Sequence, residues 1–316
     1  MDNSNQLTSS DQKFFDSHVQ IGSLTMTNPV GVASGTFGYG KEYDQLIELS
    51  NLGALYTKAV TLEPRPGNRL PRIVETPGGM LNSIGLANVG SRGFTEIKYP
   101  YLKTVQTKVI VNLAGSMIED YCETLEYLEA HAPLDGYEVN VSCPNVKCGG
   151  MALGTDPHQV ELLTRELRKR TSKPLIIKLS PNVTDITEIA RASEAAGADA
   201  VSCINTLVGM LIDTKKKQPI ISTGTAGLSG PSILPVGIAA VFRVKRAIKI
   251  PVIGLGGIME PDHAIQYLLA GASAIQVGTA NFVDPSTAMR VRDGIEAYAK
   301  REGLRSISDF HGLLAG

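Results

Sequence analysis

The chain is predicted to fold as an α/β protein of the (β/α)8 (TIM) barrel class, because eight short apolar segments alternate along it with helical patterns. Most of these segments are continuously apolar, as is typical of parallel strands covered on both faces. The length of 316 residues suits one such barrel. An open doubly wound sheet is the competing architecture. It is disfavoured because no G-x-G-x-x-G pattern follows the first strand segment.

The strand segments are short, and most are rich in Val, Ile, Leu and Ala; they lie at 29–33, 54–60, 108–113, 136–141, 174–179, 200–204, 251–255 and 274–277. Helices are predicted between and after them, at 42–49, 118–130, 156–170, 184–196, 231–247, 261–269 and 286–301. The third helix has the clearest start, with Asp156 as the N-cap and Pro157 at the first helical position. Gly197 and Gly271 mark the ends of two others.

Two segments are additions to the simple barrel. Residues 18–26 are expected to form a short hairpin that closes the bottom of the barrel. Residues 61–92, rich in Pro, Gly and Asn, form a long insert after the second strand. Such long loops are usually functional, and this one lies on a βα connection, which is the active-site face of the fold. Residues 1–17 are expected to be a polar tail, and 18–316 a single catalytic domain.

Composition excludes several classes of function. The formal net charge of −1 gives no electrostatic case for binding nucleic acid or an anionic membrane. No apolar run approaches the roughly 20 residues of a membrane span, and the N-terminus lacks the apolar centre of a signal peptide. A cytoplasmic protein is expected. None of the four cysteines forms a C-x-x-C pair, so no metal or cluster site is predicted, and Cys122 is expected to be a packing residue.

Polar residues and glycines gather where the predicted strands end, and the carboxyl ends of barrel strands form the active-site face. In chain order they are Ser34 and Thr36, Lys58, Asn112, Asn140 and Cys143, Lys178, Asn205 and Thr206, Gly256 and Gly257, and Gly278 and Thr279. Lys58 and Lys178 stand in otherwise apolar strands. A buried ammonium group needs an anionic partner, so these two lysines point to a site rather than to packing.

The glycines after the last two strands predict a phosphate site, because backbone N–H groups can approach a phosphate closely there. The segment 227–231 adds a third glycine-rich turn that opens a helix. A lysine fixed beside a flavin stabilises its reduced form. FMN is therefore favoured over a plain sugar phosphate.

The segment 140–145, Asn-Val-Ser-Cys-Pro-Asn, places a thiol between carboxamides where a strand breaks at a proline. The thiol can act as a base or nucleophile, and carboxamides can hold an amide-rich planar ligand. A buried cysteine beside turn residues is the alternative interpretation of this segment taken alone.

Taken together, these motifs are highly specific, and from about residue 18 onward the chain resembles the dihydroorotate dehydrogenases. The motifs are Ala33-Ser34-Gly35-Thr36-Phe37-Gly38, Asn82-Ser83-Ile84-Gly85-Leu86, the 140–145 segment, Ile204-Asn205-Thr206, Gly256-Gly257-Ile258 and Gly278-Thr279. Cys143 in place of serine is similar to class 1. Within class 1, the segments 37–40 and 145–150 are similar to the NAD-linked class 1B catalytic subunit. The resemblance to the fumarate-using class 1A is weaker there.

The resemblance implies oxidation of (S)-dihydroorotate to orotate in pyrimidine (UMP) biosynthesis, with Cys143 as the general base at C5 and hydride passing from C6 to FMN. It implies a substrate site made of Lys58, Asn82, Ser83, Ile84, Gly85, Leu86, Asn140, Asn145, Asn205 and Thr206. It implies one FMN per chain, held by Ser34, Lys58, Ala59, Asn112, Asn140, Lys178, Ile204, Gly230, Gly256, Gly257, Gly278 and Thr279. Cys148 has no role in this resemblance.

The resemblance also implies a homodimer, joined in a heterotetramer by an electron-transfer subunit that carries FAD and a [2Fe–2S] cluster. Four alternatives remain open from the sequence. The first is a class 1A-type enzyme that uses fumarate as its electron acceptor. The second is a different FMN barrel acting on pyrimidines, like a domain of dihydropyrimidine dehydrogenase. Another is a non-redox phosphate-binding barrel such as an aldolase or isomerase. The fourth, a non-enzymatic scaffold, is disfavoured by the polar strand ends.

Overall fold

Eight parallel strands close into a barrel in the computed structural model, which describes residues 15–142, 147–148 and 151–315. The strands follow the chain around the barrel and are β3 (Val30–Val32), β4 (Ala54–Tyr56), β7 (Lys108–Leu113), β8 (Gly136–Asn140), β11 (Leu175–Lys178), β12 (Ala200–Cys203), β17 (Val252–Leu255) and β18 (Ala274–Val277). All eight predicted strands are confirmed. The second is shorter than predicted, since beyond Tyr56 it continues only as an isolated bridge between Val60 and Leu113.

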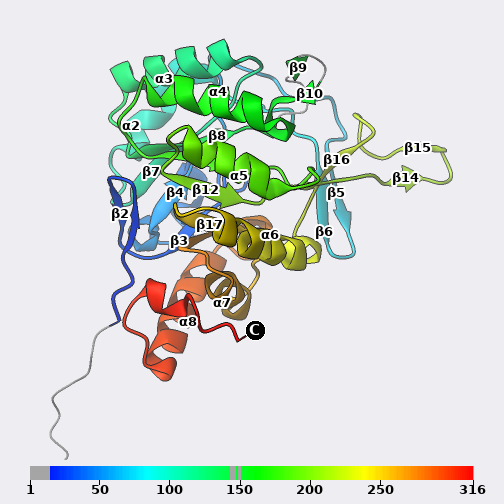
Figure 1. Ribbon diagram of the computed structural model, residues 1–316. Helices are drawn as coiled ribbons and strands as arrows, with labels where there is room; N and C mark the ends of the chain where they lie inside the picture. The colour runs from blue at the N-terminus through cyan, green and yellow to red at the C-terminus, as the bar shows by residue number, and fades with distance from the viewer. Residues whose placement is uncertain (1–14, 143–146, 149–150, 316) are drawn as a thin grey trace, which may run out of the picture.

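Helices cover the outside of the barrel (Figure 1). The longer ones are α3 (Ile118–His131), α4 (Pro157–Arg168), α5 (Ile186–Ala195), α6 (Leu234–Ala247), α7 (Pro261–Leu269) and α8 (Thr287–Glu302). They confirm six of the predicted helices. The Asp156 carboxylate accepts a hydrogen bond from the His158 N–H, which confirms the predicted cap of α4. Cys122 is buried in α3, as expected of a packing residue. No helix within the described ranges is long and apolar enough to cross a lipid bilayer.

The helix predicted at 42–49 is wrong. The segment instead forms two 3-10 turns, η1 (Lys41–Tyr43) and η2 (Leu49–Asn51). Tyr43 stacks on Phe37 with ring centroids 3.9 Å apart, and the Glu42 carboxylate accepts a hydrogen bond from the Tyr39 N–H. These contacts hold the chain in turns, and a helix of eight residues has little propensity of its own to resist them. The helices between β4 and β7 begin only after the long insert. They are α1 (Gly90–Gly93), the π-turn η3 (Phe94–Lys98) and α2 (Tyr99–Leu102).

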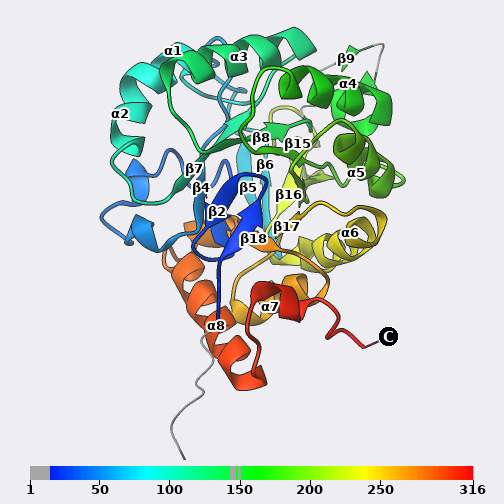
Figure 2. The same ribbon diagram turned by 60° about the vertical axis from the view of Figure 1, so that its left-hand side comes forward.

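The predicted hairpin at 18–26 is confirmed as β1 (Val19–Ile21) and β2 (Leu24–Met26). It lies across one end of the barrel, in front of the strands in Figure 2, and buries Ile21 and Met26 completely. This is the end at which the barrel strands begin. The C-terminal turn η7 (Ile307–Phe310) adds Phe310, which packs on Phe15 and Tyr298.

A four-stranded antiparallel sheet lies at the opposite end of the barrel from the hairpin (Figure 1). Its order is β13 (Leu207–Gly209), β16 (Ala226–Ser229), β6 (Gly79–Asn82) and β5 (Ile73–Thr76). It joins the insert after the second barrel strand to the connection after the sixth. The sequence did not predict this sheet, and the glycine-rich turn predicted at 227–231 is in part the strand β16.

Short elements complete the connections: β9 (Lys147–Cys148), β10 (Met151–Ala152), η4 (Leu153–Thr155), β14 (Ile212–Asp213), β15 (Gln218–Pro219), η5 (Pro231–Ile233) and η6 (Thr279–Phe282).

The close approach of α6 to α7 and β17 gives a test of the packing. A Cβ atom added to Gly237 would lie 1.9 Å from the Tyr267 hydroxyl oxygen, and that hydroxyl donates to the Gly256 carbonyl at 2.8 Å. We therefore expect Gly237→Ala to lower the thermal midpoint by several degrees. The clash should outweigh the helix propensity of alanine, which favours it by only about 1 kcal/mol.

The matched control is Val236→Ala, on the exposed side of the same helix. It should leave the midpoint nearly unchanged. Equal midpoints for the two variants, measured by circular dichroism, would contradict the packing described for α6.

Candidate functional site

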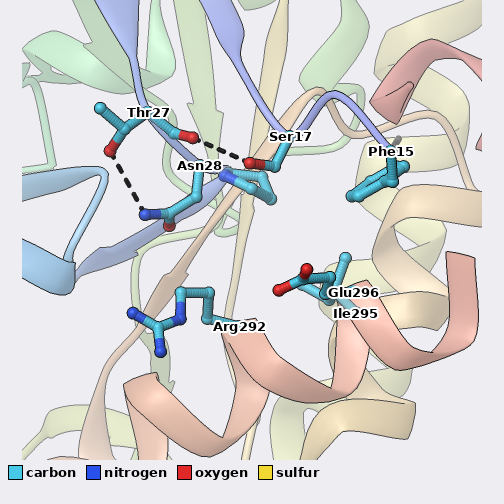
Figure 3. A pocket seen from close by; sticks show the side chains of 8 residues that line it. Phe15, Ser17, Thr27, Asn28, Arg292, Ile295 and Glu296 are labelled. Carbon is cyan, nitrogen blue, oxygen red and sulfur yellow. Dashed lines mark hydrogen bonds between the residues drawn. The ribbon is translucent and has the colours of Figure 1, made fainter. Parts of the chain in front are cut away.

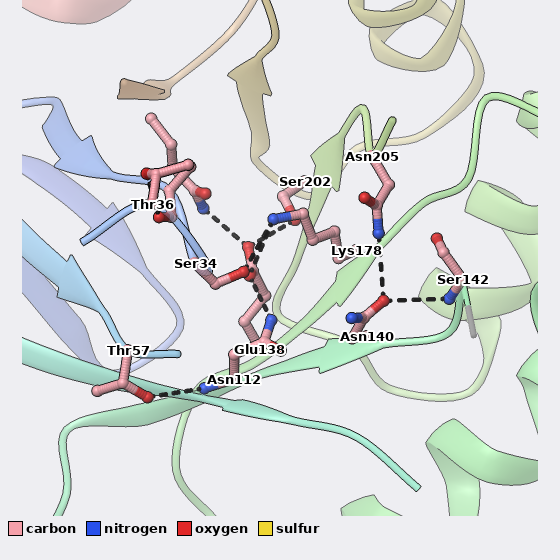
Figure 4. Close-up of polar contacts among 12 residues, drawn as sticks. Ser34, Thr36, Thr57, Asn112, Glu138, Asn140, Ser142, Lys178, Ser202 and Asn205 are labelled. Carbon is pink, nitrogen blue, oxygen red and sulfur yellow. Dashed lines mark hydrogen bonds and ion pairs between the residues drawn. The ribbon is translucent and has the colours of Figure 1, made fainter. Parts of the chain in front are cut away.

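A fully buried carboxylate, that of Glu138, lies inside the barrel. Its side chain projects from β8 and accepts hydrogen bonds from residues on four other barrel strands (Figure 4). The donors are Asn112 Nδ2 at 2.7 Å, Gln276 Nε2 at 2.8 Å, Ser202 Oγ at 2.9 Å and Lys178 Nζ at 3.4 Å. A buried charge is tolerated when it is paired and hydrogen-bonded, and both conditions are met here. Sequence analysis missed Glu138. The available signal was its place two residues before Asn140, which puts both side chains on one face of the strand.

Lys178 links this carboxylate to the end of the first barrel strand. Its side chain is buried, its ammonium group lies 3.4 Å from Glu138 Oε2, and it donates to Ser34 Oγ at 3.2 Å. The prediction that a buried lysine needs an anionic partner is therefore confirmed for Lys178. Ser34 and Glu138 accept two of the three ammonium protons, and no other described residue accepts the third, which could bind a ligand.

Lys58 differs from Lys178 because it is only half-buried at the end of β4. Burial holds the pKa of the Lys58 ammonium below the usual lysine value, and repulsion from Arg72 lowers it further, while Glu42 opposes the shift. Lys98 adds a weaker repulsion. The surroundings of this ammonium are thus positive on balance, and an anionic ligand would be stabilised beside it.

Two predicted carboxamides meet at the ends of β8 and β12. Asn205 Nδ2 donates to Asn140 Oδ1 at 3.2 Å, and the same oxygen accepts from the Ser142 N–H at 3.2 Å (Figure 4). The Tyr121 hydroxyl donates to the Asn140 carbonyl at 2.8 Å and ties this strand end to α3. Because Asn140 Oδ1 accepts both bonds, its NH₂ group is left to face another partner.

The four-stranded sheet brings the insert against the sixth strand end. Asn82 Nδ2 donates to the Gly227 carbonyl at 3.4 Å, and the Thr206 side chain packs directly against Gly227. Ser83 Oγ accepts from Asn68 Nδ2 at 2.8 Å and from the Thr223 hydroxyl at 2.9 Å. Asn82 is thus the last residue of β6, and Thr206 directly precedes β13, so the sheet brings two distant segments with predicted substrate residues together.

The rest of the 82–86 motif is held through its backbone. The Ile84 carbonyl accepts from the Asn68 N–H at 3.0 Å, and the Leu86 carbonyl accepts from Asn88 Nδ2 at 2.7 Å. Gly85 and Leu86 both have positive φ values, 73° and 56°. The motif is therefore a tight turn whose shape is fixed by the insert itself.

The predicted phosphate glycines also come together. Thr279 Oγ1 donates to Ser229 Oγ at 2.8 Å, which joins the end of β18 to the residue before Gly230. Gly257 has a φ of 74°, and a Cβ there would lie 2.7 Å from the Leu234 nitrogen, so only glycine lets the β17 loop reach the start of α6. Among the described residues, no acceptor engages the backbone N–H of Gly257 or Thr279. These groups suit a phosphate.

The remaining predicted cofactor residues lie at adjacent strand ends. Asn112 is fully buried, with its N–H 3.4 Å from Thr57 Oγ1, and its Oδ1 finds no hydrogen-bond partner among the described residues. Ala59 is buried beside Lys58. Ile204 is buried and donates its N–H to the Leu255 carbonyl at 3.0 Å, next to Gly256. Gly278 begins the turn after β18.

Cys143 and Asn145, the predicted base and one predicted substrate residue, lie outside the described residues. The same holds for the side chain of Cys148. Their roles stay predictions that rest on the sequence.

A cavity of about 200 Å³ lies at the other end of the barrel, against the segment that precedes β3 (Figure 3). It is lined by Phe15, Ser17, Thr27, Asn28, Pro29, Arg292, Ile295 and Glu296. The Asn28 side chain already bonds to the Asn51 carbonyl and to the Val30 N–H. Because the cavity adjoins residues 27–29, before the start of β3, it lies at the end of the barrel opposite the strand ends that carry the candidate site.

The fold and the strand ends define a (β/α)8 barrel with glycine-rich loops after its last strands, a buried lysine–glutamate pair and converging carboxamides. A family model described as dihydroorotate dehydrogenase matches residues 17–298. The chain is 51% identical over 299 residues to "Dihydroorotate dehydrogenase B (NAD(+)), catalytic subunit" of Geotalea uraniireducens, covering 95% of this chain and 98% of the relative. The protein of that name from Bacteroides thetaiotaomicron is also 51% identical, over 95% of this chain and 99% of the relative. The chain belongs to the dihydroorotate dehydrogenase family.

The buried Lys178–Glu138 pair gives a stability test. Glu138→Gln removes the charge that compensates a buried ammonium, so we expect it to lower the free energy of unfolding by roughly 3–5 kcal/mol. The control is Glu129→Gln, which breaks a partly exposed ion pair with Lys173 and should cost less than about 1 kcal/mol. Denaturant titrations followed by circular dichroism measure both values. If both variants lost a similar small amount of unfolding free energy, the buried pair would contribute no more to stability than the partly exposed pair.

Proposed function

We propose that this chain oxidises (S)-dihydroorotate to orotate in pyrimidine biosynthesis, using FMN bound at the carboxyl ends of the barrel strands. The observation that carries the proposal is identity above 50% across 95% of the chain to a named dihydroorotate dehydrogenase subunit from Geotalea daltonii, which is 52% identical. The arrangement of lysines, carboxamides and glycines around the strand ends supports it.

The residues present fit FMN on two counts. The backbone N–H groups of Gly257 and Thr279, which bond to no acceptor in the described part of the chain, suit its phosphate. Lys178 has one ammonium proton and Asn112 one oxygen, Oδ1, without a partner among the described residues, and they offer a donor and an acceptor. When bound, FMN would accept a hydride from C6 of the substrate. The other proposed contacts are Ser34, Lys58, Ala59, Asn140, Ile204, Gly230, Gly256 and Gly278.

The substrate would lie over this site, against the four-stranded sheet. Lys58 supplies a cation to its carboxylate from a positive neighbourhood. Asn140 and Asn205, already bonded to each other, and Asn82 on the sheet offer the donor and acceptor groups that the ring amides need. Ser83, Ile84, Gly85, Leu86, Asn145 and Thr206 complete the proposed substrate site.

Cys143 would remove the proton from C5. Its segment continues directly from β8, so the thiol follows Asn140 by three residues. A thiol is an effective base only as the thiolate, and its ordinary pKa is about 8.5. Proton removal should therefore become faster as the pH rises toward that value.

Electrons would pass to NAD⁺ through a second subunit that carries FAD and a [2Fe–2S] cluster, with a homodimer of this chain at the centre of a heterotetramer. The relatives are named NAD(+)-linked catalytic subunits, which supports a partner of this kind. Fumarate as direct acceptor is the outcome that would point to class 1A behaviour.

The test of the whole proposal is an anaerobic visible spectrum of the purified chain before and after adding dihydroorotate. We expect a yellow protein whose flavin absorbance is bleached by the substrate. NAD⁺ added afterwards should restore the colour slowly without the partner subunit. Rapid restoration by NAD⁺ alone would contradict the need for a partner, and rapid restoration by fumarate would replace the proposed acceptor. A colourless chain that no flavin can reconstitute would overturn the function.

Replacing Cys143 tests the base. We expect Cys143→Ser to retain FMN but to be reduced by dihydroorotate at least about 100-fold more slowly at neutral pH, the lower end of what general base catalysis contributes. In the unmodified chain, stopped-flow reduction should accelerate with pH and level off above the thiol pKa. Cys122→Ser, in a packing position on α3, is the control and should change neither the rate nor its pH profile. Equal reduction rates in Cys143→Ser and the unmodified chain would rule out this role.

The lowered pKa of Lys58 predicts a second pH effect. Its cation is present at low pH and is lost as the pH rises through a pKa below the usual lysine value of 10.5. Orotate binding should therefore weaken on the alkaline side earlier than for an ordinary lysine. In Lys58→Met, binding should be weaker throughout and that alkaline limb should disappear.

The measurement is orotate titration followed by flavin absorbance, in a Cys143→Ser background so that the thiol does not titrate in the same range. Lys98→Met is the matched control, since Lys98 lies nearby over the Tyr39 ring. If the alkaline limb were lost in Lys98→Met and kept in Lys58→Met, the pH effect would belong to Lys98, and its assignment to Lys58 would be wrong.

A further inference from the structure

The burial of Glu138 has no explanation in stability alone. Replacing a buried ion pair with well-packed apolar residues is often neutral or stabilising, so such a pair is weak support for a structural role. Yet four strands direct donors at this single carboxylate, and both of its oxygens are engaged by two donors each. Such a cluster fixes the positions of its donors, and two of those donors, Lys178 and Asn112, are proposed FMN contacts.

The carboxylate determines which atoms these two residues present to a ligand. A carboxylate only accepts hydrogen bonds, so Asn112 must direct Nδ2 toward Glu138 and its Oδ1 away from it. Lys178 is held between Glu138 Oε2 and Ser34 Oγ (Figure 4), which fixes the direction of its third proton. Glu138 imposes the first constraint and shares the second with Ser34. It precedes Asn140 by two residues on the same strand.

The carboxylate also determines the net charge beside the cofactor. Lys178 contributes one positive charge and Glu138 one negative charge 3.4 Å away, in a region where both side chains are almost completely buried. At low dielectric such charges act strongly over short distances. The field of Lys178 is therefore partly cancelled, and a bound flavin that gained negative charge on reduction would be stabilised less by this lysine.

We propose that Glu138 is a positioning residue that sets the reduction potential of the bound flavin through Lys178, by fixing the ammonium in place and compensating its charge. The inference rests on the proposed function. Glu138 itself need not touch the flavin or the substrate. Its effect reaches the reaction through the charge and placement of Lys178.

The test is a spectroelectrochemical titration of the FMN-loaded chain and five variants, of which one is a double variant. Glu138→Gln should raise the flavin midpoint potential, because the lysine is no longer compensated. Lys178→Met should lower it, because the carboxylate is left alone. We expect shifts of at least about 30 mV in each direction, which is tenfold in the equilibrium constant of a two-electron couple. Glu138→Asp should stay closer to the unmodified chain than Glu138→Gln, and Glu129→Gln should not shift the potential.

The double variant Glu138→Gln/Lys178→Met restores neutrality and keeps the test decisive even where Glu138→Gln alone fails to fold. Its potential should lie above that of Lys178→Met. A double variant that matches Lys178→Met, or a folded Glu138→Gln that matches the unmodified chain while its stability falls, would show that Glu138 is merely structural.

These outcomes differ from failure of the proposed function. If the unmodified chain binds FMN and is bleached by dihydroorotate, the function stands whatever the Glu138 variants do. If the unmodified chain cannot hold a flavin at all, both proposals are overturned.

Discussion

The buried carboxylate of Glu138 is the constraint on which the arrangement of the barrel mouth depends. A charge inside a barrel is tolerated only when donors surround it, and here they come from β7, β11, β12 and β18. Each donor that turns toward Glu138 has its remaining polar atoms fixed in direction. The hydrogen bonds to Glu138 thus set the directions of polar side chains in the barrel core, and Asn112 and Lys178, two residues of the candidate site, are among them.

Above this layer, the site is closed by segments that the barrel itself does not need. The insert after the second strand and the connection after the sixth form one antiparallel sheet, in which Asn82 on β6 bonds to Gly227 on β16. Backbone pairing between these two segments gives the proposed substrate face a rigid support. Side chains on a sheet are held more precisely than side chains on separate loops, which suits a site that has to orient a small planar acid.

The phosphate end depends on a different kind of constraint, the close approach of backbones. Gly257 reaches the start of α6 in a conformation with positive φ, and Tyr267 anchors the preceding carbonyl from α7. The same tyrosine leaves no room for a side chain at Gly237. One aromatic residue thus couples the packing of two helices to the loop that would hold a phosphate.

The sequence by itself determined the eight strands, most of the helices, the closing hairpin and the strand-end positions of the lysines, carboxamides and glycines. It could do so because burial on both faces demands continuous apolar runs, and because caps such as Asp156 act within a few residues. Only the tertiary structure decided the turns at 41–51, the four-stranded sheet and the Glu138 cluster. Three of the four partners of Glu138, Asn112, Lys178 and Gln276, lie 26, 40 and 138 residues away. No local pattern encodes such pairings, because they exist only once the barrel has closed and brought the inward faces of distant strands together.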